Sequence, residues 1–264
     1  MNDEVTLISG YDVGDLPNTP LIPFIDEKAC SVAYKAMLGA VIPYGIPVGY
    51  AQEQNGAIIQ HVVPNPKTEY QQISSSSKVD LGLHTETAFH PYKPDYVFLM
   101  CLRGDENAVT TYATMSDILS ELDDVCLTVL FQPMYLTSVD ESFRTNGEPD
   151  TPVVTSVLYE TEHTGLSMCY DATVMKGTTP AAQNALEEFG RAVVKHTREI
   201  VLKEGDLLII NNARAVHGRK PFQARYDGTD RWLLRTLVRK FGQPLPKDTK
   251  YCPTTGYPVI TKYI

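Results

Sequence analysis

The feature that most limits the fold of this 264-residue chain is a succession of short apolar runs, each ended by a proline, a glycine or a polar turn. The runs at 57–63, 96–102, 207–210 and 231–238 have the usual length of buried strands and are short for helices. The 18 prolines and 17 glycines stand mostly between such runs, where they favour turns. We therefore expect a mainly β fold, a sandwich or a barrel, with flanking helices.

Three segments have a composition or an apolar spacing that suits a helix, at residues 25–38, 115–122 and 180–196. The last is the clearest, because Pro180 suits a first helical turn and Leu186, Phe189 and Val193 form one apolar stripe. There is no internal repeat and no linker long enough to force a division. We expect one domain over residues 1–264, with a core at roughly 54–240, an N-terminal arm and a C-terminal extension.

The overall charge limits the partners. A formal net charge of −9 argues against nucleic acids and anionic membranes, and no apolar run approaches the roughly 18 residues of a spanning helix. The acidic start does not resemble a signal peptide. The five cysteines are odd in number and form no CxxC pair, which favours reduced thiols. We expect a cytoplasmic protein with a small-molecule substrate; the oligomeric state is not predicted.

Metal-ligand chemistry is indicated by His84-Thr-Glu86 together with His217. In an extended backbone, residues two apart share one face, so His84 and Glu86 reach toward the same point. With His217 they form a set of two imidazoles and one carboxylate, which suits a non-haem Fe(II) with open positions. Each motif has a plainer interpretation, a packed or surface histidine, which is favoured when either is taken alone.

A carboxylate-binding strand is indicated at 231–238. Arg231 and Arg235 share one face of this apolar strand with Leu233 and Leu237. Guanidinium groups form paired hydrogen bonds to carboxylates, so two of them on one face predict a site for small acids. The alternative is structural ion pairing with a nearby acid such as Asp227 or Asp230.

These motifs resemble those of the Fe(II)/2-oxoglutarate-dependent oxygenases. The resemblance rests on segments 84–96, 216–222 and 225–235, extends from about 54 to 238, and is strongest to the TauD-type, clavaminate synthase-like branch. That branch includes arginine and asparagine β-hydroxylases. The resemblance implies a double-stranded β-helix (a cupin-like jelly roll), with Fe(II) and the cosubstrates 2-oxoglutarate and O₂.

The resemblance also implies roles for individual residues. His84, Glu86 and His217 correspond to the iron ligands, and Arg231 to the arginine that binds the distal carboxylate of 2-oxoglutarate. One threonine of the pair at 110–111 is its hydroxyl partner, and the motif does not choose between Thr110 and Thr111.

The expected substrate contacts come from the same resemblance. Arg235 corresponds to a residue that holds the substrate carboxylate. Ser74 and Gln54 lie where family members contact substrate, and Asp171 lies near acidic positions that bind a cationic side chain. If Glu53 also faces the cavity, a basic amino acid is favoured.

The expected activity is hydroxylation of an unactivated C–H bond in a small polar molecule, a free L-amino acid or a close derivative. A carboxylate at Glu86 favours hydroxylation or desaturation over chlorination, because the related halogenases have a small residue there. Alternatives are an oxygenase acting on a cyclic dipeptide or another natural-product intermediate, and a metal-binding jelly roll without oxygenase activity. A carbohydrate-binding β-sandwich ranks last, because the single tryptophan, Trp232, lies in an expected core strand.

Overall fold

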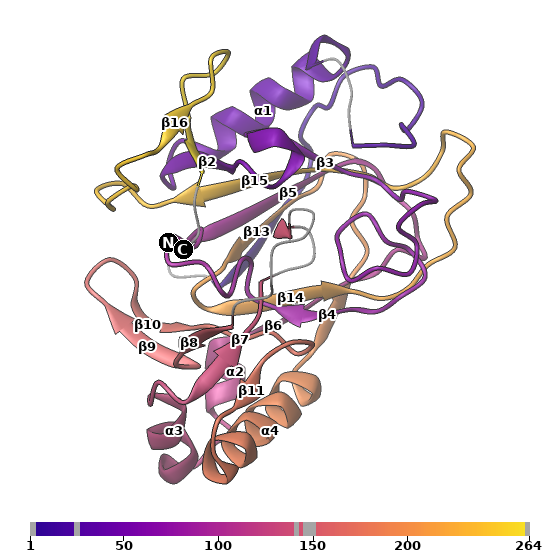
Figure 1. Ribbon diagram of the computed structural model, residues 1–264. Coiled ribbons are helices and arrows are strands. Elements are labelled where there is room, and N and C mark those ends of the chain that lie inside the picture. Colours follow the sequence, from indigo (N-terminus) through magenta and orange to yellow (C-terminus); the bar gives the residue numbers. More distant parts are fainter. Residues whose placement is uncertain (1–3, 24–26, 140–142, 145–151, 262–264) are drawn as a thin grey trace.

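The computed structural model describes residues 4–23, 27–139, 143–144 and 152–261. A large sheet has the strand order β1-β13-β5-β15-β2-β17-β16, and β3 also pairs with β15 (Figure 1). The bounds of its strands are β1 Val5–Ile8, β2 Ile46–Tyr50, β3 Gln60–Val62, β5 Tyr96–Arg103, β13 Leu207–Asn211, β15 Trp232–Arg239, β16 Lys250–Tyr251 and β17 Pro258–Ile260.

A second sheet has four strands in the order β12-β6-β14-β4, all antiparallel. Their bounds are β4 Leu81–His84, β6 Thr110–Thr114, β12 Arg198–Ile200 and β14 Ala215–Arg219. The chain passes from β13 of the large sheet to β14 of this one through a turn of three residues, 212–214. One tight connection therefore fixes the position of the small sheet against the large one.

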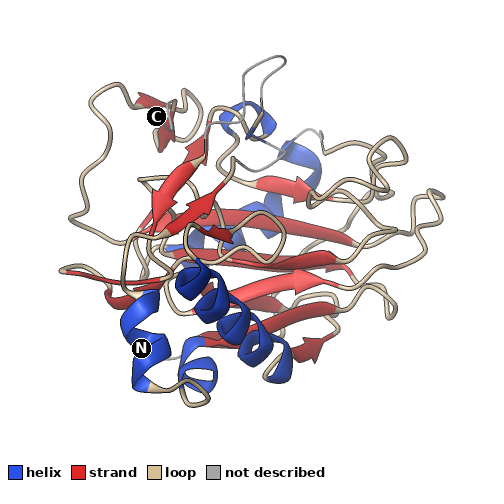
Figure 2. Cartoon of the chain, turned by 60° about the horizontal axis from the view of Figure 1, so that its bottom comes forward, coloured by secondary structure: helices blue, strands red, loops and turns tan. Residues whose placement is uncertain are grey.

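The remaining elements flank the two sheets. A hairpin is formed by β9 Leu158–Thr161 and β10 Gly165–Met168, and a three-stranded sheet by β7 Tyr135–Thr137, β8 Val153–Thr155 and β11 Lys176–Gly177. The helices are α1 Ser31–Val41, α2 Met115–Leu119, α3 Asp124–Leu130 and α4 Pro180–Lys195, with short 3₁₀ segments η1 Glu27–Cys30 and η2 Gln54–Gly56. Figure 1 shows α1 beside the large sheet and the other three helices at the opposite end of the molecule. Strands predominate over helices in Figure 2, and the predicted mainly β class is confirmed.

Strand alternation in β15 separates two layers of core. Leu233 and Leu237 pack in the cluster between the sheets, together with Ala215 of β14. Trp232 and Leu234 point the other way, into a cluster that α1 covers with its buried side chains Ala33, Met37 and Val41. The faces expected from the sequence are the ones observed, so Arg231 and Arg235 lie on the side that faces the small sheet.

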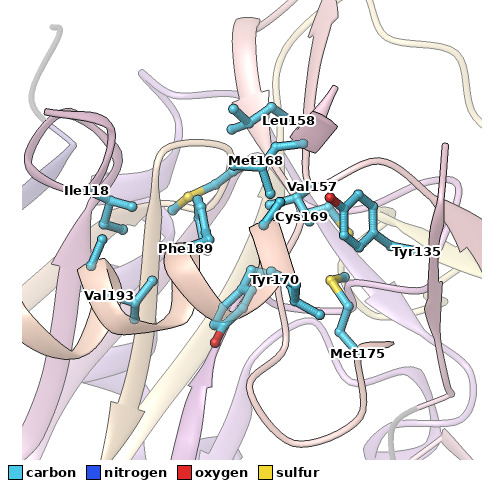
Figure 3. Packing of buried hydrophobic residues seen from close by; sticks show 14 of the residues in the cluster. Ile118, Tyr135, Val157, Leu158, Met168, Cys169, Tyr170, Met175, Phe189 and Val193 are labelled. Carbon is cyan, nitrogen blue, oxygen red and sulfur yellow. The ribbon is translucent and has the colours of Figure 1, made fainter. Parts of the chain in front are cut away.

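The long helix covers the outer face of the small sheet. Thr179 caps α4, its hydroxyl accepting a hydrogen bond from the Ala182 N–H at 3.2 Å, and Pro180 occupies the first turn as expected. Phe189 and Val193 pack in the cluster drawn in Figure 3, which also contains Ala113 and Val216 of the small sheet. Val216 lies outward, so its neighbour His217 lies inward, toward the large sheet.

Some boundaries differ from the sequence-based expectation. The helix expected at 25–38 is α1 over 31–41, preceded by η1, and α3 was not predicted, because its β-branched residues do not favour a helix. Asp123 offsets this by accepting a hydrogen bond from the Cys126 N–H. The large sheet also extends beyond 54–240, because β1, β2, β16 and β17 all join it. In the part of the chain that is described, no helix is long and apolar enough to cross a membrane.

A buried histidine links α1 to β15. His61 of β3 is 4% exposed; its Nδ1 accepts from the Trp232 indole N–H at 2.8 Å, and its Nε2 lies 2.6 Å from the Tyr34 hydroxyl. Because the indole only donates, the neutral ring carries its proton on Nε2 and donates to Tyr34. Burial lowers the pKa of His61 to about 4.

This buried histidine makes stability depend on pH. The folded pKa lies below that of an unfolded histidine, so the unfolded chain binds more protons and stability is lost as the pH falls from about 6.5 toward 4. From pH 7 to pH 5 we expect the unfolding free energy to fall by about 2 kcal/mol on account of His61. Urea unfolding at both pH values checks this against His61→Gln; an equal pH dependence in the two proteins would contradict it.

Candidate active site

Two imidazoles face each other across neighbouring strands. His84 ends β4 and lies directly opposite His217 of β14, with the ring centroids 4.6 Å apart. Glu86 follows two residues after His84 and is buried. Each of the three residues offers a ligand atom, and these atoms lie within 4.8 Å of one another. The structure therefore brings the three predicted metal ligands together.

Hydrogen bonds already orient these side chains. The Nδ1 of His84 lies 2.8 Å from the Gly82 carbonyl and donates to it, so Nε2 keeps its lone pair for a ligand. Glu86 accepts a hydrogen bond from the Arg235 Nη1 at 2.9 Å through Oε1. Its other oxygen, Oε2, is buried and 3.4 Å from the His217 Nε2, without a hydrogen bond from any described residue. A buried carboxylate oxygen without a hydrogen bond is costly, and a bound cation would remove that cost.

The protonation states suit a divalent metal. Burial alone would raise the pKa of Glu86, but the Arg235 guanidinium and the two histidines outweigh burial and hold the pKa below its ordinary range. Burial lowers the pKa of His217, and His84 adds to the shift. The site thus offers an anionic carboxylate and a neutral imidazole, the forms in which these groups bind metals. Two nitrogens and one oxygen on one side of a cavity suit Fe(II).

The three side chains open into a cavity of about 510 Å³. Its wall includes residues from both sheets and from the loops at 72–74 and 171–174, together with Val139 and Arg144. The charged side chains that line it, besides the three just described, are Glu53, Arg144, Asp171, Arg219, Arg231 and Arg235. Groups of both signs meet there, which suits small zwitterionic or acidic molecules.

Two buried guanidiniums lie at one end of the cavity. Arg231 is 6% exposed, and its guanidinium lies 5.5 Å from the centre of the Phe222 ring; that of Arg219 lies 5.1 Å from the same ring. Burial lowers the pKa of Arg231 to about 10 and that of Arg219 to about 9, so both remain charged at neutral pH. Among the described residues, neither has a carboxylate within 4 Å (Arg231 has no hydrogen-bond partner at its Nε). Buried guanidiniums without a carboxylate in contact favour an anionic ligand.

The cavity distinguishes the two threonines that the motif left open. Thr110 lines it, and in the sheet it lies opposite Arg219. Thr111 lies opposite Gly218 and does not line the cavity; as the neighbour of Thr110 in the strand, it directs its side chain to the other face of the small sheet. Of the two threonines, it is therefore Thr110 that shares the cavity wall with Arg231.

Arg235 is bound more extensively than the sequence suggested. Its Nη2 donates to Glu53 Oε2 at 2.6 Å and its Nε to Gln60 Oε1 at 2.7 Å, in addition to the bond to Glu86. At least three of its five N–H donors are thus used by protein side chains. Arg235 lines the cavity, but its first effect is to fix the carboxylates of Glu86 and Glu53.

The other predicted substrate contacts divide. Ser74 and Asp171 line the cavity. The backbone of Asp171 pairs with that of His84 in an isolated antiparallel β-bridge, on the edge of β4 away from β14. One oxygen of Asp171 accepts from the Thr173 N–H and hydroxyl. Gln54 is not brought to the cavity: its side-chain amide makes two hydrogen bonds to the main chain of His61.

Sequence reasoning missed two arginines of the wall. Arg219 stands two residues after His217, a spacing that puts both on one strand face, and that signal was available. It donates to the Ser76 hydroxyl at 2.8 Å and so holds the serine-rich loop. Arg144 also lines the cavity, and no periodic pattern in the sequence points to it.

Comparison with known proteins identifies the class. Residues 10–237 match the model of the taurine catabolism dioxygenase TauD, TfdA family. An L-lysine 3-hydroxylase of Catenulispora acidiphila is 32% identical over 90% of this chain and 68% of its own length. An L-asparagine oxygenase of Streptomyces coelicolor is 34% identical over 84% of this chain and 66% of its own. The chain spans about two thirds of the length of these relatives.

Solved structures agree. An asparagine oxygenase in complex with Fe(II), a hydroxyasparagine and succinate has a TM-score of 0.85 and 31% identity, over 98% of this chain and 80% of that one. The non-heme iron oxygenase OrfP with Fe and alpha-ketoglutaric acid has a TM-score of 0.78 and 34% identity, over 90% and 75%. The chain belongs to the TauD/TfdA family of dioxygenases. The resemblance and the jelly-roll fold predicted from the sequence are both confirmed.

Removing His84 tests the metal centre. His84 is only half-buried, and its one side-chain hydrogen bond within the described part of the chain is to a local carbonyl, so we expect His84→Ala to fold normally. Its Fe(II) affinity, measured by anaerobic titration, should fall by more than about 100-fold, beyond the loss caused by removing an outer partner. His196→Ala, which removes a histidine that directly follows α4 and pairs with Glu121, is the control and should bind Fe(II) as the parent does. Equal affinities in all three proteins would contradict the assignment.

Proposed function

We propose that this protein is an Fe(II)/2-oxoglutarate-dependent dioxygenase that hydroxylates an unactivated C–H bond of a free L-amino acid, most favourably one with a basic side chain. One observation carries the proposal. The cluster of His84, Glu86 and His217 shares a single cavity with Arg231, a buried guanidinium without a carboxylate partner among the described residues. A metal-binding jelly roll without oxygenase activity has no need of a carboxylate site there.

The family implies an iron ion and a keto acid, and the residues present fit both. His84, Glu86 and His217 would hold the metal, and Arg231 with the Thr110 hydroxyl would bind the distal carboxylate of 2-oxoglutarate. When bound, iron, 2-oxoglutarate and O₂ supply the oxidation, which yields succinate, CO₂ and the hydroxylated product. The chain's own work is to place the reactants and exclude water.

The acidic wall supports a basic substrate. Glu53 and Asp171 both line the cavity, as the expectation of a basic amino acid required. We infer that Arg235, already fixed by Glu86 and Glu53, directs a remaining N–H toward the substrate carboxylate, and that Asp171 faces the cationic end. Ser74 lies on the same wall. The named activities of relatives, L-lysine 3-hydroxylase and L-ornithine/L-arginine 3-hydroxylase, agree with this substrate class.

A second candidate is a natural-product intermediate. Clavaminate synthase 2 of Streptomyces clavuligerus is 33% identical over 90% of this chain. An enzyme of this type would keep the same iron and keto-acid sites and differ in the loops at 72–74 and 171–174.

We infer that the protein acts in the cytoplasm. This compartment agrees with the free, buried thiols of Cys30, Cys101 and Cys126 and with the need to keep iron ferrous.

Substitution of Arg231 should weaken the binding of 2-oxoglutarate and leave the binding of Fe(II) almost unchanged. In Arg231→Met we expect the KM for 2-oxoglutarate to rise by at least about 30-fold, the equivalent of ~2 kcal/mol for a lost charged hydrogen-bond pair. Fe(II) affinity should stay within about threefold. Arg225→Met, which changes a partly exposed arginine in the preceding loop, is the control. Equal losses for iron and 2-oxoglutarate in Arg231→Met would contradict its role.

The substrate class is tested by succinate release. We expect release in the presence of Fe(II), 2-oxoglutarate and O₂ to be stimulated by lysine, arginine or ornithine, and least by aspartate and glutamate, because Glu53 and Asp171 repel a second carboxylate. Product mass should increase by one oxygen atom. Stimulation by none of the twenty standard amino acids or ornithine, with intact iron and keto-acid binding, would favour the natural-product candidate.

A further inference from the structure

Asn212 occupies an unusual position between the two sheets. It directly follows β13, in the three-residue turn that leads to β14 and His217, and it is 2% exposed. Its main-chain N–H donates to the Asp95 carbonyl at 2.8 Å, so the backbone at this point is fixed. The amide side chain is therefore presented rigidly from the end of a core strand.

The side-chain amide of Asn212 makes its hydrogen bonds to the main chain around Glu86, which lies 126 residues earlier in the sequence. Its Oδ1 accepts from the Glu86 N–H at 2.6 Å, and its Nδ2 donates to the Glu86 carbonyl at 3.1 Å. A third bond runs from Nδ2 to the Pro94 carbonyl at 2.9 Å. Since an N–H only donates and a carbonyl only accepts, this is the one orientation of the amide that satisfies all three groups.

The segment that Asn212 holds is under strain. Thr87 follows Glu86 with φ +52°, a left-handed conformation that is a genuine outlier for a β-branched residue, and its side chain is fully buried. Such a conformation persists only where the surroundings enforce it. On the other side, the Thr85 N–H donates to the Tyr170 carbonyl at 2.8 Å. Glu86 thus lies between Thr85, whose main chain is hydrogen-bonded, and Thr87, whose main chain is strained, and Asn212 binds the main chain of this middle residue.

We propose that Asn212 is a positioning residue for the metal site, holding the main chain of Glu86 so that its carboxylate faces His84 and His217. Arg235 alone does not fix this direction, because it binds one oxygen and the peptide can still rotate about Cα. The same turn places His217, five residues on, so β13 and its turn set two ligands at once. This inference rests on the proposed metal site.

The test is metal affinity in matched variants, with Co(II) alone as the probe and no 2-oxoglutarate. For Asn212→Ala we expect Co(II) to bind roughly 10- to 100-fold more weakly, the effect of losing an outer partner of a ligand. Asn212→Asp keeps the size but removes both donors, and we expect at least a tenfold loss. Asn211→Ala changes the neighbouring amide, which contacts Ala213 and not Glu86, and should bind within about threefold of the parent. Parent-like affinity in Asn212→Asp, or an equal loss in Asn211→Ala, would overturn the proposal.

Hydrogen exchange of the metal-free parent gives an independent reading. The Glu86 amide should be protected at least about 100-fold without metal, and Asn212→Ala, which removes the Oδ1 that accepts from this amide, should reduce that protection at least tenfold while the amides of β5 stay unchanged. If Glu86 exchanges freely in the parent, the proposal fails whatever the metal data show. If the parent does not bind Co(II) but Glu86 is protected through Asn212, the positioning stands and the metal site proposed above fails.

Discussion

The antiparallel register between β4 and β14 is the constraint on which the site depends. It sets His84 directly opposite His217 and leaves Glu86 just beyond the end of β4. A slip of one residue would turn His217 toward α4 and bring Val216 into the cavity. Both flanks of β4 hold this register, since β14 pairs with one edge and the segment around Asp171 with the other. The apolar packing of α4 on the outer face keeps Val216 where it is.

The cavity has two ends that differ in how their buried charges are paired. Around the metal ligands, Arg235 closes a network with Glu86 and Glu53, so these charges are compensated within the protein. At the far end, Arg231 and Arg219 have no carboxylate partner within 4 Å in the described chain. The cavity therefore carries a compensated end that suits a metal and a zwitterion, and a positive end that suits a carboxylate.

Much of this arrangement follows from local sequence pattern. The two-residue period of β15 predicts that Arg231 and Arg235 share one face, and Pro180 with the apolar stripe of α4 predicts the bounds of this helix almost to the residue. The spacing of His84 and Glu86 predicts that they share a face. Periodicity of this kind assigns a side chain to a face of its own strand.

Periodicity does not assign partners across the fold. The bond from Arg235 to Glu53 joins residues 182 positions apart, and that from Asn212 to Glu86 joins residues 126 apart. Which of Thr110 and Thr111 faces the cavity depends on where β6 begins to pair with β14, which neither strand encodes alone. The family resemblance placed Gln54 among the substrate contacts. Its left-handed backbone conformation instead directs the side-chain amide to the main chain of His61.

The most direct measurement is an anaerobic titration of the metal-free protein with Fe(II), with and without 2-oxoglutarate, followed by visible absorption. A ferrous ion held by two imidazoles and one carboxylate has positions left for a keto acid. We expect a weak visible charge-transfer band that develops only with both components and saturates at one equivalent of iron. A protein that binds Fe(II) tightly but shows no such band at saturating 2-oxoglutarate would contradict the dioxygenase assignment.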